Sequence, residues 1–368
     1  MPVITYSCPN CGGGLIFDPE TQQYKCEYCL SLFSQKQLDA LVPSAAQDGI
    51  GKPEPGVGHG VSGQPGFIGG HGAEDMPPVV YSCPSCGAEI VTDETTAATF
   101  CYYCHNPVIL SGRLEGNLRP DCVVPFSIDR KRAEEIFSEW IRGKRYVPKD
   151  FYSSEQIKTM TGVYFPYWIY QCRIEGRMTA KGTKLRSWTA GNLRYTEKKV
   201  YQIERSGQVK IRNVARNALK KANSRLSEGV LPFSLNDTRP FSAACLSGFM
   251  AEKRDRLSQE FEIEVRQEVQ DFAVNCMKDS AKGYAGLSVS VQQTDIREPV
   301  WSYGLFPVWT LTYKGPKDGK IYYFALNGQT GKVCGELPVD GGKLFLLFLS
   351  VFFPLCLVLL GAGYLLPF

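Results

Sequence analysis

The sequence predicts an α+β protein with two small cysteine-bearing modules, an antiparallel-sheet-rich body and one long apolar C-terminal helix. Three observations lead to this prediction: a repeated quartet of cysteines, strand-like segments interspersed with two helix-like ones, and an uncharged run near the C-terminus. The 368 residues suffice for two or three domains, and 43% hydrophobic with 21% charged residues is a globular composition. That composition excludes wholesale disorder, a fibrous repeat and a polytopic transporter.

The N-terminal cysteines form two quartets with identical spacing. In each, a CxxC pair is followed after fourteen residues by a second CxxC pair, and the second quartet repeats the first at an offset of 75 positions. Two CxxC turns complete a tetrahedron of sulfurs around one ion at about 2.3 Å per bond. The spacing therefore predicts two zinc ribbons, each with a short hairpin between its knuckles. The ligands are Cys8, Cys11, Cys26 and Cys29 in the first and Cys83, Cys86, Cys101 and Cys104 in the second.

Four thiolates leave no open coordination position, so we expect two structural Zn²⁺ ions that do no chemistry. We expect the first ribbon and a short helix in residues 1–42, and the second ribbon in residues 79–112. The intervening residues 43–78 are rich in Gly and Pro, which predicts a flexible linker and leaves the first ribbon free to search for a partner.

The chain has three histidines, and none lies after residue 105, so the larger part of the chain cannot use imidazole as a base or ligand. His59 and His71 lie in the expected linker. His105 directly follows Cys104 and is either a competing ligand or a bystander near a sulfur. The other cysteines before the apolar run stand singly, which indicates core residues rather than nucleophiles; they are Cys122, Cys172, Cys245, Cys276 and Cys334.

Residues 344–366 form an uncharged run of 23 residues, about 34 Å as a helix and enough to cross a hydrocarbon core of about 30 Å. The alternative is a buried core helix. Lys332 and Lys343 precede the run, and the N-terminus carries no secretory leader. We therefore expect a single-pass, tail-anchored protein of the cell membrane with its N-terminal body in the cytoplasm, where cysteines are metal ligands or free thiols.

Residues 113–340 predict an α+β body. Two segments have the apolar spacing of a helix. The first places Ala133, Ile136, Phe137, Trp140 and Ile141 on one face, and the second places Phe261, Val265, Val269, Phe272 and Cys276 on one face. The remaining segments alternate as strands of an antiparallel meander, with turns at residues 315–319 and 327–331. Two Phe-Pro-X-Trp motifs, at residues 165–168 and 306–309, predict prolines at strand starts and tryptophans in the core.

Positive charge is concentrated in residues 177–225, where 14 Lys or Arg stand against two Glu, although the whole chain has a formal charge of only +4. Such a stretch suits anionic lipid headgroups, a nucleic-acid backbone or an acidic partner, or it is simply a solvated face. The sequence contains neither a phosphate-binding GxxxxGK[ST] loop nor a GxSxG motif, so we expect no nucleotide-driven motor and no enzyme. A carboxylate-based site stays open as an alternative.

The combination of cysteine quartets, body motifs and a C-terminal apolar run resembles a bacterial family described as TFIIB-type zinc-ribbon-containing membrane proteins. Members of this family are often mislabelled as primosomal helicase. The resemblance rests on CPSCGAEI…CYYCHNPVIL, PFSIDRKRAEEIF…W, FPYWIYQCRIEG, RPFSAACLSGFMAEKRD and FPVWTLTY…YYFALNGQTGKV. It implies a place beside SPFH-type scaffolds and phage-shock protein A in membrane-stress complexes. The two ribbons and the basic stretch 177–225 depart from the family pattern.

The sequence thus favours a non-catalytic, membrane-anchored adaptor whose zinc ribbons dock protein partners at the cytosolic membrane face. The alternative is a membrane-tethered nucleic-acid-binding protein, whose binding would weaken steeply with salt.

Overall fold

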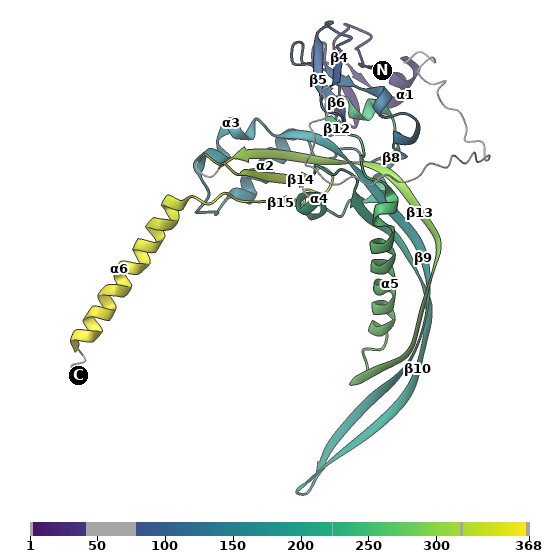
Figure 1. The fold of residues 1–368 in the computed structure, drawn as a ribbon, viewed down its shortest axis with the longest axis vertical. Coiled ribbons are helices and arrows are strands. Elements are labelled where there is room, and N and C mark those ends of the chain that lie inside the picture. The colour runs from purple at the N-terminus through teal and green to yellow at the C-terminus, as the bar shows by residue number, and fades with distance from the viewer. Residues whose placement is uncertain (1–2, 42–78, 223, 317–318, 366–368) are drawn as a thin grey trace, which may run out of the picture. The chain divides into compact units, whose positions relative to one another are not determined.

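The computed structural model describes residues 3–41, 79–222, 224–316 and 319–365, and it confirms a mixed α+β chain with a sheet-rich body (Figure 1). The chain divides into two compact units. Unit 1 comprises Met1–Asn117 with Ser242–Lys253, and unit 2 comprises Leu118–Phe241 with Arg254–Phe368. The segment Ser242–Lys253 therefore belongs with the cysteine-bearing residues, although the sequence places it inside the expected body. The expected linker 43–78, with its two histidines, lies outside the described residues.

Unit 1 contains short strands around the two cysteine quartets. The hairpin expected within the first quartet is present, because β1 (Leu15–Asp18) pairs antiparallel with β2 (Gln23–Cys26). The second quartet differs from the first: β5 pairs with β4, and β6 pairs with β7 and β12. The remaining elements are β3 (Leu32–Phe33), α1 (Gln35–Leu41), β4 (Val79–Ser82), β5 (Glu89–Thr92), β6 (Thr96–Phe100), β7 (Pro107–Ile109), β12 (Met250–Glu252) and 3₁₀ turns at Ser111–Arg113, Gly116–Leu118 and Ala243–Leu246.

Unit 2 is organised around three long strands, β9 (Thr161–Ala190), β10 (Leu193–Asn217) and β13 (Gly286–Lys314). β9 lies between β10 and β13 and pairs antiparallel with both, while β13 pairs on its other edge with β14 and, in parallel, with β8. The expected antiparallel pairing is thus present among the long strands, and β8 adds a parallel pairing to β13. The further elements are β8 (Cys122–Val123), α2 (Arg130–Ile141), α3 (Ser154–Ile157), α4 (Ser224–Gly229), β11 (Arg239–Pro240), α5 (Glu262–Asp279), β14 (Ile321–Asn327), β15 (Val333–Gly335), α6 (Gly341–Leu365) and 3₁₀ turns at Lys149–Tyr152, Leu235–Asp237 and Ser258–Phe261.

Helix α5 packs alongside β9 (Figure 1). Phe261, Val265, Val269 and Ala273 meet the buried side chains of β9. The sequence prediction had this face partly wrong, because Phe272 is 51% exposed and Cys276 is also exposed. The contact face turns toward the small Ala273, which allows the helix to approach the strand closely.

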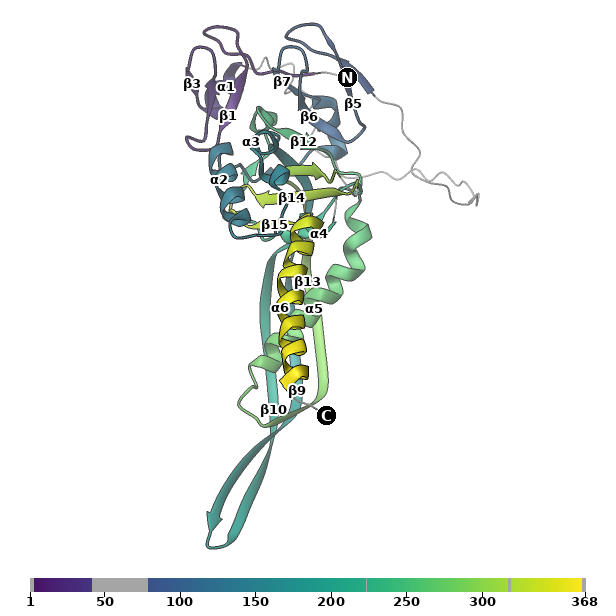
Figure 2. The ribbon, with the colours of Figure 1, turned by 90° about the vertical axis from the view of Figure 1, so that its left-hand side faces the viewer.

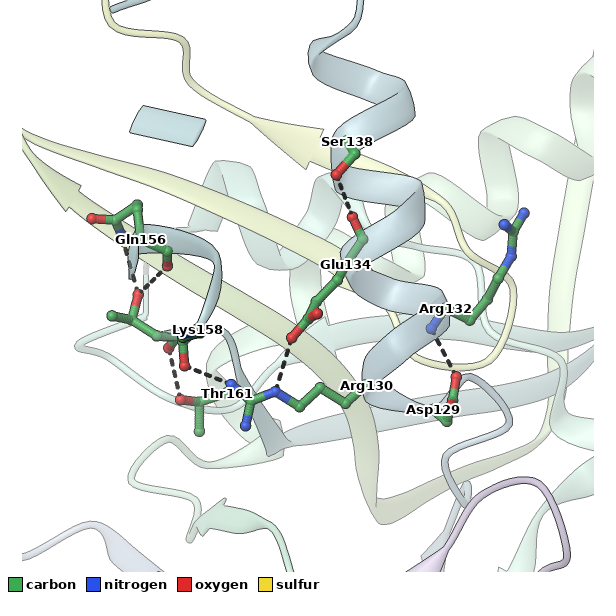
Figure 3. A network of polar contacts seen from close by, with 9 residues as sticks. Asp129, Arg130, Arg132, Glu134, Ser138, Gln156, Lys158 and Thr161 are labelled. Atoms are coloured by element: carbon green, nitrogen blue, oxygen red, sulfur yellow. Dashed lines mark hydrogen bonds and ion pairs between the residues drawn. The ribbon is translucent and has the colours of Figure 1, made fainter. Parts of the chain in front are cut away.

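Helix α2 forms as its apolar spacing predicts, with Ala133, Phe137 and Ile141 buried. The Asp129 carboxylate accepts from the backbone N–H of Arg132 at 2.8 Å and caps the helix. Arg130 holds Glu134 at 3.0 Å and also donates to the carbonyl of Lys158 at the end of α3 (Figure 3). This polar network therefore ties α2 to α3 and is structural.

The two Phe-Pro motifs lie directly opposite each other, with Phe306 of β13 paired to Phe165 of β9. The expectation of prolines at strand starts is wrong, since Pro166 and Pro307 both lie inside long strands. Each proline lacks one donor, but its carbonyl still accepts a backbone N–H, from Ala218 and from Gly328 respectively. The repeated motif is thus one layer of the sheet core.

The turn after β14 matches its prediction. The Asn327 side chain is fully buried and accepts from the backbone N–H groups of Gln329 and Thr330, both at 2.9 Å, while its Nδ2 donates to the carbonyl of Val230 at 2.8 Å. Gly331 has φ +78°, a left-handed conformation that favours glycine. Asn327 therefore joins the turn to the chain beyond α4.

Candidate metal centres and membrane helix

Each of the four CxxC turns has the same backbone hydrogen-bond pattern. In the first, Cys8 N–H donates to Gly13 O at 2.6 Å and Gly12 N–H donates to Cys8 O at 2.8 Å. Equivalent pairs of bonds begin at Cys26, Cys83 and Cys101. The residue after each second cysteine is left-handed, and these residues are Gly12, Leu30, Gly87 and His105, with φ between +57° and +76°. The turn geometry aims both sulfurs of each pair to the same side.

The eight predicted ligands come together as two groups of four. Cluster 1 is Cys8, Cys11, Cys26 and Cys29, and cluster 2 is Cys83, Cys86, Cys101 and Cys104; within each, all sulfurs lie within 4.8 Å of one another.

The sulfur separations fit a tetrahedral ion. A tetrahedron with metal–sulfur bonds of about 2.3 Å has edges of about 3.8 Å. In cluster 1 the pairs Cys8–Cys29 and Cys11–Cys26 are 3.5 and 3.4 Å apart. In cluster 2 the corresponding pairs are 3.8 and 3.6 Å apart. Four sulfurs at these distances could hold one Zn²⁺ with no coordination position left for water.

Cluster 1 contains a thiol that ionises easily. The Cys29 thiol donates to Ser31 Oγ at 3.2 Å, and the same oxygen accepts from the side-chain amide of Asn10 at 2.9 Å. Hydrogen bonding with the Ser31 side chain, and then with the Ser31 backbone, lowers the pKa of Cys29 to about 6. A thiolate is the form that binds metal, so this hydrogen bonding favours the coordinating form of Cys29.

A buried arginine supports cluster 2. Arg113 is 4% exposed, and its guanidinium donates to the carbonyls of Asp93 and Thr96, both at 2.5 Å, and lies 5.2 Å from the ring centre of Tyr81. It therefore fastens the turn between β5 and β6 to the apolar side of the cluster. The sequence carried no signal for this role, because nothing in the pattern marks Arg113 as buried.

The first cysteine module is packed, not free. Ile4 exchanges backbone hydrogen bonds of 2.9 and 3.0 Å with Ile109, beside cluster 2. Phe17 contacts the ring of Phe249 at 6.5 Å, and the Tyr24 hydroxyl lies 3.8 Å from Cys245 Sγ. The prediction of an independent, searching module is therefore wrong for the described residues, because the segment at 242–253 supplies it with a common core.

His105 lies outside cluster 2: its side chain is exposed, and its left-handed backbone matches that of Leu30 in cluster 1. Its position is thus set by the turn.

Of the single cysteines, Cys172 and Cys245 are buried as predicted, but Cys276 is exposed. Burial raises the pKa of the half-buried Cys122 to about 11, which makes this thiol a poor nucleophile at neutral pH.

Helix α6 begins at Gly341, three residues before the expected start. Asp340 caps it, with its carboxylate accepting from Gly342 N–H at 2.9 Å. Residues Gly341–Leu360 have a mean hydropathy of 2.6, and none of the most apolar stretch is buried. Among the described residues this is the one helix long and apolar enough to cross a membrane. The alternative of a buried core helix is not what the structure shows.

The chain is similar to a bacterial protein of nearly the same extent. The chain is 28% identical over 341 residues to the Bacillus subtilis (strain 168) protein named "Uncharacterized protein YdjG", and the alignment covers 93% of this chain and 92% of that protein. No protein-family model matches the chain. No solved structure matches it either.

Proposed function

We propose that this chain is a non-catalytic, membrane-anchored zinc protein that docks protein partners at the cytosolic membrane face. The observation that carries the proposal is the pairing, on one chain, of two four-sulfur clusters with an apolar helix whose segment Gly341–Leu360 is not buried in the described part of the chain. Closed sulfur sites brace a fold and leave the metal no open position for a substrate. An apolar helix without a covering partner is stabilised by lipid.

The docking surface in this proposal is the set of aromatic side chains on the turns of the clusters. Tyr28 in cluster 1 is 74% exposed, and Tyr102 and Tyr103 in cluster 2 are 67% and 73% exposed. Tyrosine is enriched among residues that dominate binding energy at protein interfaces. Zinc would hold these rings rigidly, which lowers the entropy that a partner must overcome. The family resemblance suggests SPFH-type scaffolds and phage-shock protein A as partners.

The test is crosslinking in intact cells, followed by purification from the membrane fraction and mass spectrometry. The unaltered chain should recover a scaffold or stress protein, and the double variant Tyr102→Ala with Tyr103→Ala should lose it while keeping its zinc. Tyr146→Ala provides a matched control, since Tyr146 is an exposed ring outside both clusters. Recovery of the same proteins by all three chains, or of none, would refute docking through these rings.

Nucleic-acid binding is the second candidate, and one observation favours it. Most of the 14 basic residues of 177–225 lie on β9 and β10. A phosphate backbone bound there would give an affinity that falls steeply with salt, by about 10³-fold or more between 50 and 200 mM for six or more contacts. Fluorescence anisotropy with a labelled duplex across this salt range tests it, and a flat or absent signal disposes of it.

A further inference from the structure

The hairpin of β9 and β10 continues beyond the third long strand. β13 begins at Gly286, opposite Thr183, while β9 and β10 run on to a tight turn at Gly191, whose φ is +59° (Figure 2). Residues 184–190 and 193–199, called here the distal ribbon, are thus two-stranded in the part of the chain that the structure describes. Seven residue pairs at about 3.4 Å per residue extend it by about 24 Å.

The distal ribbon exposes four large apolar side chains. Trp188 and Tyr195 are directly opposite each other, with ring centres 5.7 Å apart and planes at 14°. The second pair toward the turn, Ala190 and Leu193, shares their face because side chains alternate along a strand. Trp188, Tyr195 and Leu193 are 46%, 45% and 63% exposed, and Leu185 on the opposite face is 57% exposed.

The same short ribbon is strongly cationic. Five basic side chains stand against Glu197, a net charge of +4 over residues 184–199. Arg186 lies 6.0 Å from the ring centre of Trp188, and Glu197 is engaged by Lys199 at 3.2 Å. The five are Lys184, Arg186, Arg194, Lys198 and Lys199.

We propose that the distal ribbon binds the surface of an anionic bilayer, with Trp188, Tyr195 and Leu193 at the boundary between headgroups and acyl chains and the cations toward lipid phosphates. Tryptophan and tyrosine concentrate at membrane interfaces because their rings are apolar at one end and polar at the other. Each cation near an anionic surface strengthens binding about fivefold. A nucleic acid would satisfy the charge but would not bury Leu193.

This inference rests on the proposed membrane anchoring. Once α6 crosses a bilayer, the ribbon belongs to a tethered chain, so even a weak surface contact is held at high effective concentration. The ribbon then acts as a second contact that fixes the orientation of the body on the membrane.

The experiment measures tryptophan emission of the full-length chain in vesicles of acyl-brominated phosphatidylcholine, with or without 30% phosphatidylglycerol. Bromine quenches only rings that reach the acyl region. Trp188 is the suitable reporter, since the other four tryptophans are buried or half-buried in unit 2 and α6 contains none. Trp188→Phe supplies the matched background, and far-ultraviolet circular dichroism verifies the fold of each protein.

We expect anionic vesicles to quench the unaltered chain and to leave Trp188→Phe much less affected. Lys198→Glu with Lys199→Glu changes the charge by four, which at about fivefold per charge lowers ribbon occupancy roughly 600-fold and abolishes the extra quenching. Lys131→Glu with Lys144→Glu, two exposed positions outside the ribbon, should leave it unchanged.

Equal quenching of the unaltered chain and Trp188→Phe would overturn the inference. So would a response of Trp188 to a DNA duplex but not to anionic vesicles, which would assign the ribbon to nucleic acid. Vesicle flotation separates the proposed anchoring by α6 from the proposed bilayer contact of the ribbon. If the chain floats with the vesicles but Trp188 is not quenched, the anchor is present and the ribbon contact is absent. A chain that does not float refutes the anchoring, and the ribbon inference with it.

Discussion

Replacing Cys83 with serine removes one sulfur from cluster 2, and the structure indicates that the module around it then unfolds. Cys83 is 1% exposed, and its sulfur lies 3.8 Å from that of Cys104. The buried core of this module contains six residues, two of which are the ligands Cys83 and Cys101. Two of the sulfurs that could hold a metal ion therefore belong to the small core itself.

The magnitude follows from the size of this core. The four remaining buried side chains, Tyr81, Ile90, Val108 and Leu110, contribute about 2 kcal/mol each, or about 8 kcal/mol together. A structural zinc contributes about 10–16 kcal/mol at neutral pH. Loss of most of that contribution equals or exceeds the whole stability of a typical small domain, about 5–15 kcal/mol. Cys83→Ser should therefore leave residues 79–110 unfolded.

The assay combines metal analysis with limited proteolysis mapped by mass spectrometry. We expect the bound zinc to fall from two ions to one per chain and new cleavage to appear within residues 79–110. Cys276→Ser is the matched control, because Cys276 is exposed on α5 and outside both clusters. Two zinc ions and an unchanged cleavage pattern in Cys83→Ser would refute the reasoning.

Three further substitutions test the supports of the fold by chemical denaturation. Arg113→Met leaves two carbonyls of its turn without their donor and should cost about 3 kcal/mol, with zinc loss at lower chelator concentration; unaltered chelator sensitivity would contradict it. Asn327→Ala removes four hydrogen bonds from a buried turn and should destabilise unit 2 by about 3 kcal/mol, and a change below about 1 kcal/mol would be inconsistent with the network. Gly87→Ala places a side chain at φ +75° and should cost about 1–2 kcal/mol, whereas Gly283→Ala, without a left-handed φ, should cost less; equal losses would argue against backbone strain at the knuckle.

Local sequence patterns predicted those features that depend on local chemistry. The CxxC spacing identified all eight sulfurs that converge in the two clusters, because the turn geometry is contained within a few residues. The helical spacing of α2 and the turn at Asn327 followed for the same reason. The apolar run predicted α6 to within three residues of its start.

Features that depend on distant partners were not accessible to local patterns. Residues 242–253 read as part of the body, yet Phe249 and Cys245 pack in unit 1 against residues more than 200 positions away. The face of α5 was misassigned because Phe272 and Ala273 both fit a helical stripe, and only the approach of β9 selects the smaller residue. The Phe-Pro motifs were recognised as related, but their cross-strand pairing required the register of β9 and β13.

The most direct test of the central claim is the metal content of the full-length chain purified from the membrane fraction with mild detergent. Our account predicts two zinc ions per chain, recovered in material that alkaline washing does not release from the membranes. Iron in place of zinc, fewer than two ions in folded protein, or a full-length chain found in the soluble fraction would contradict it.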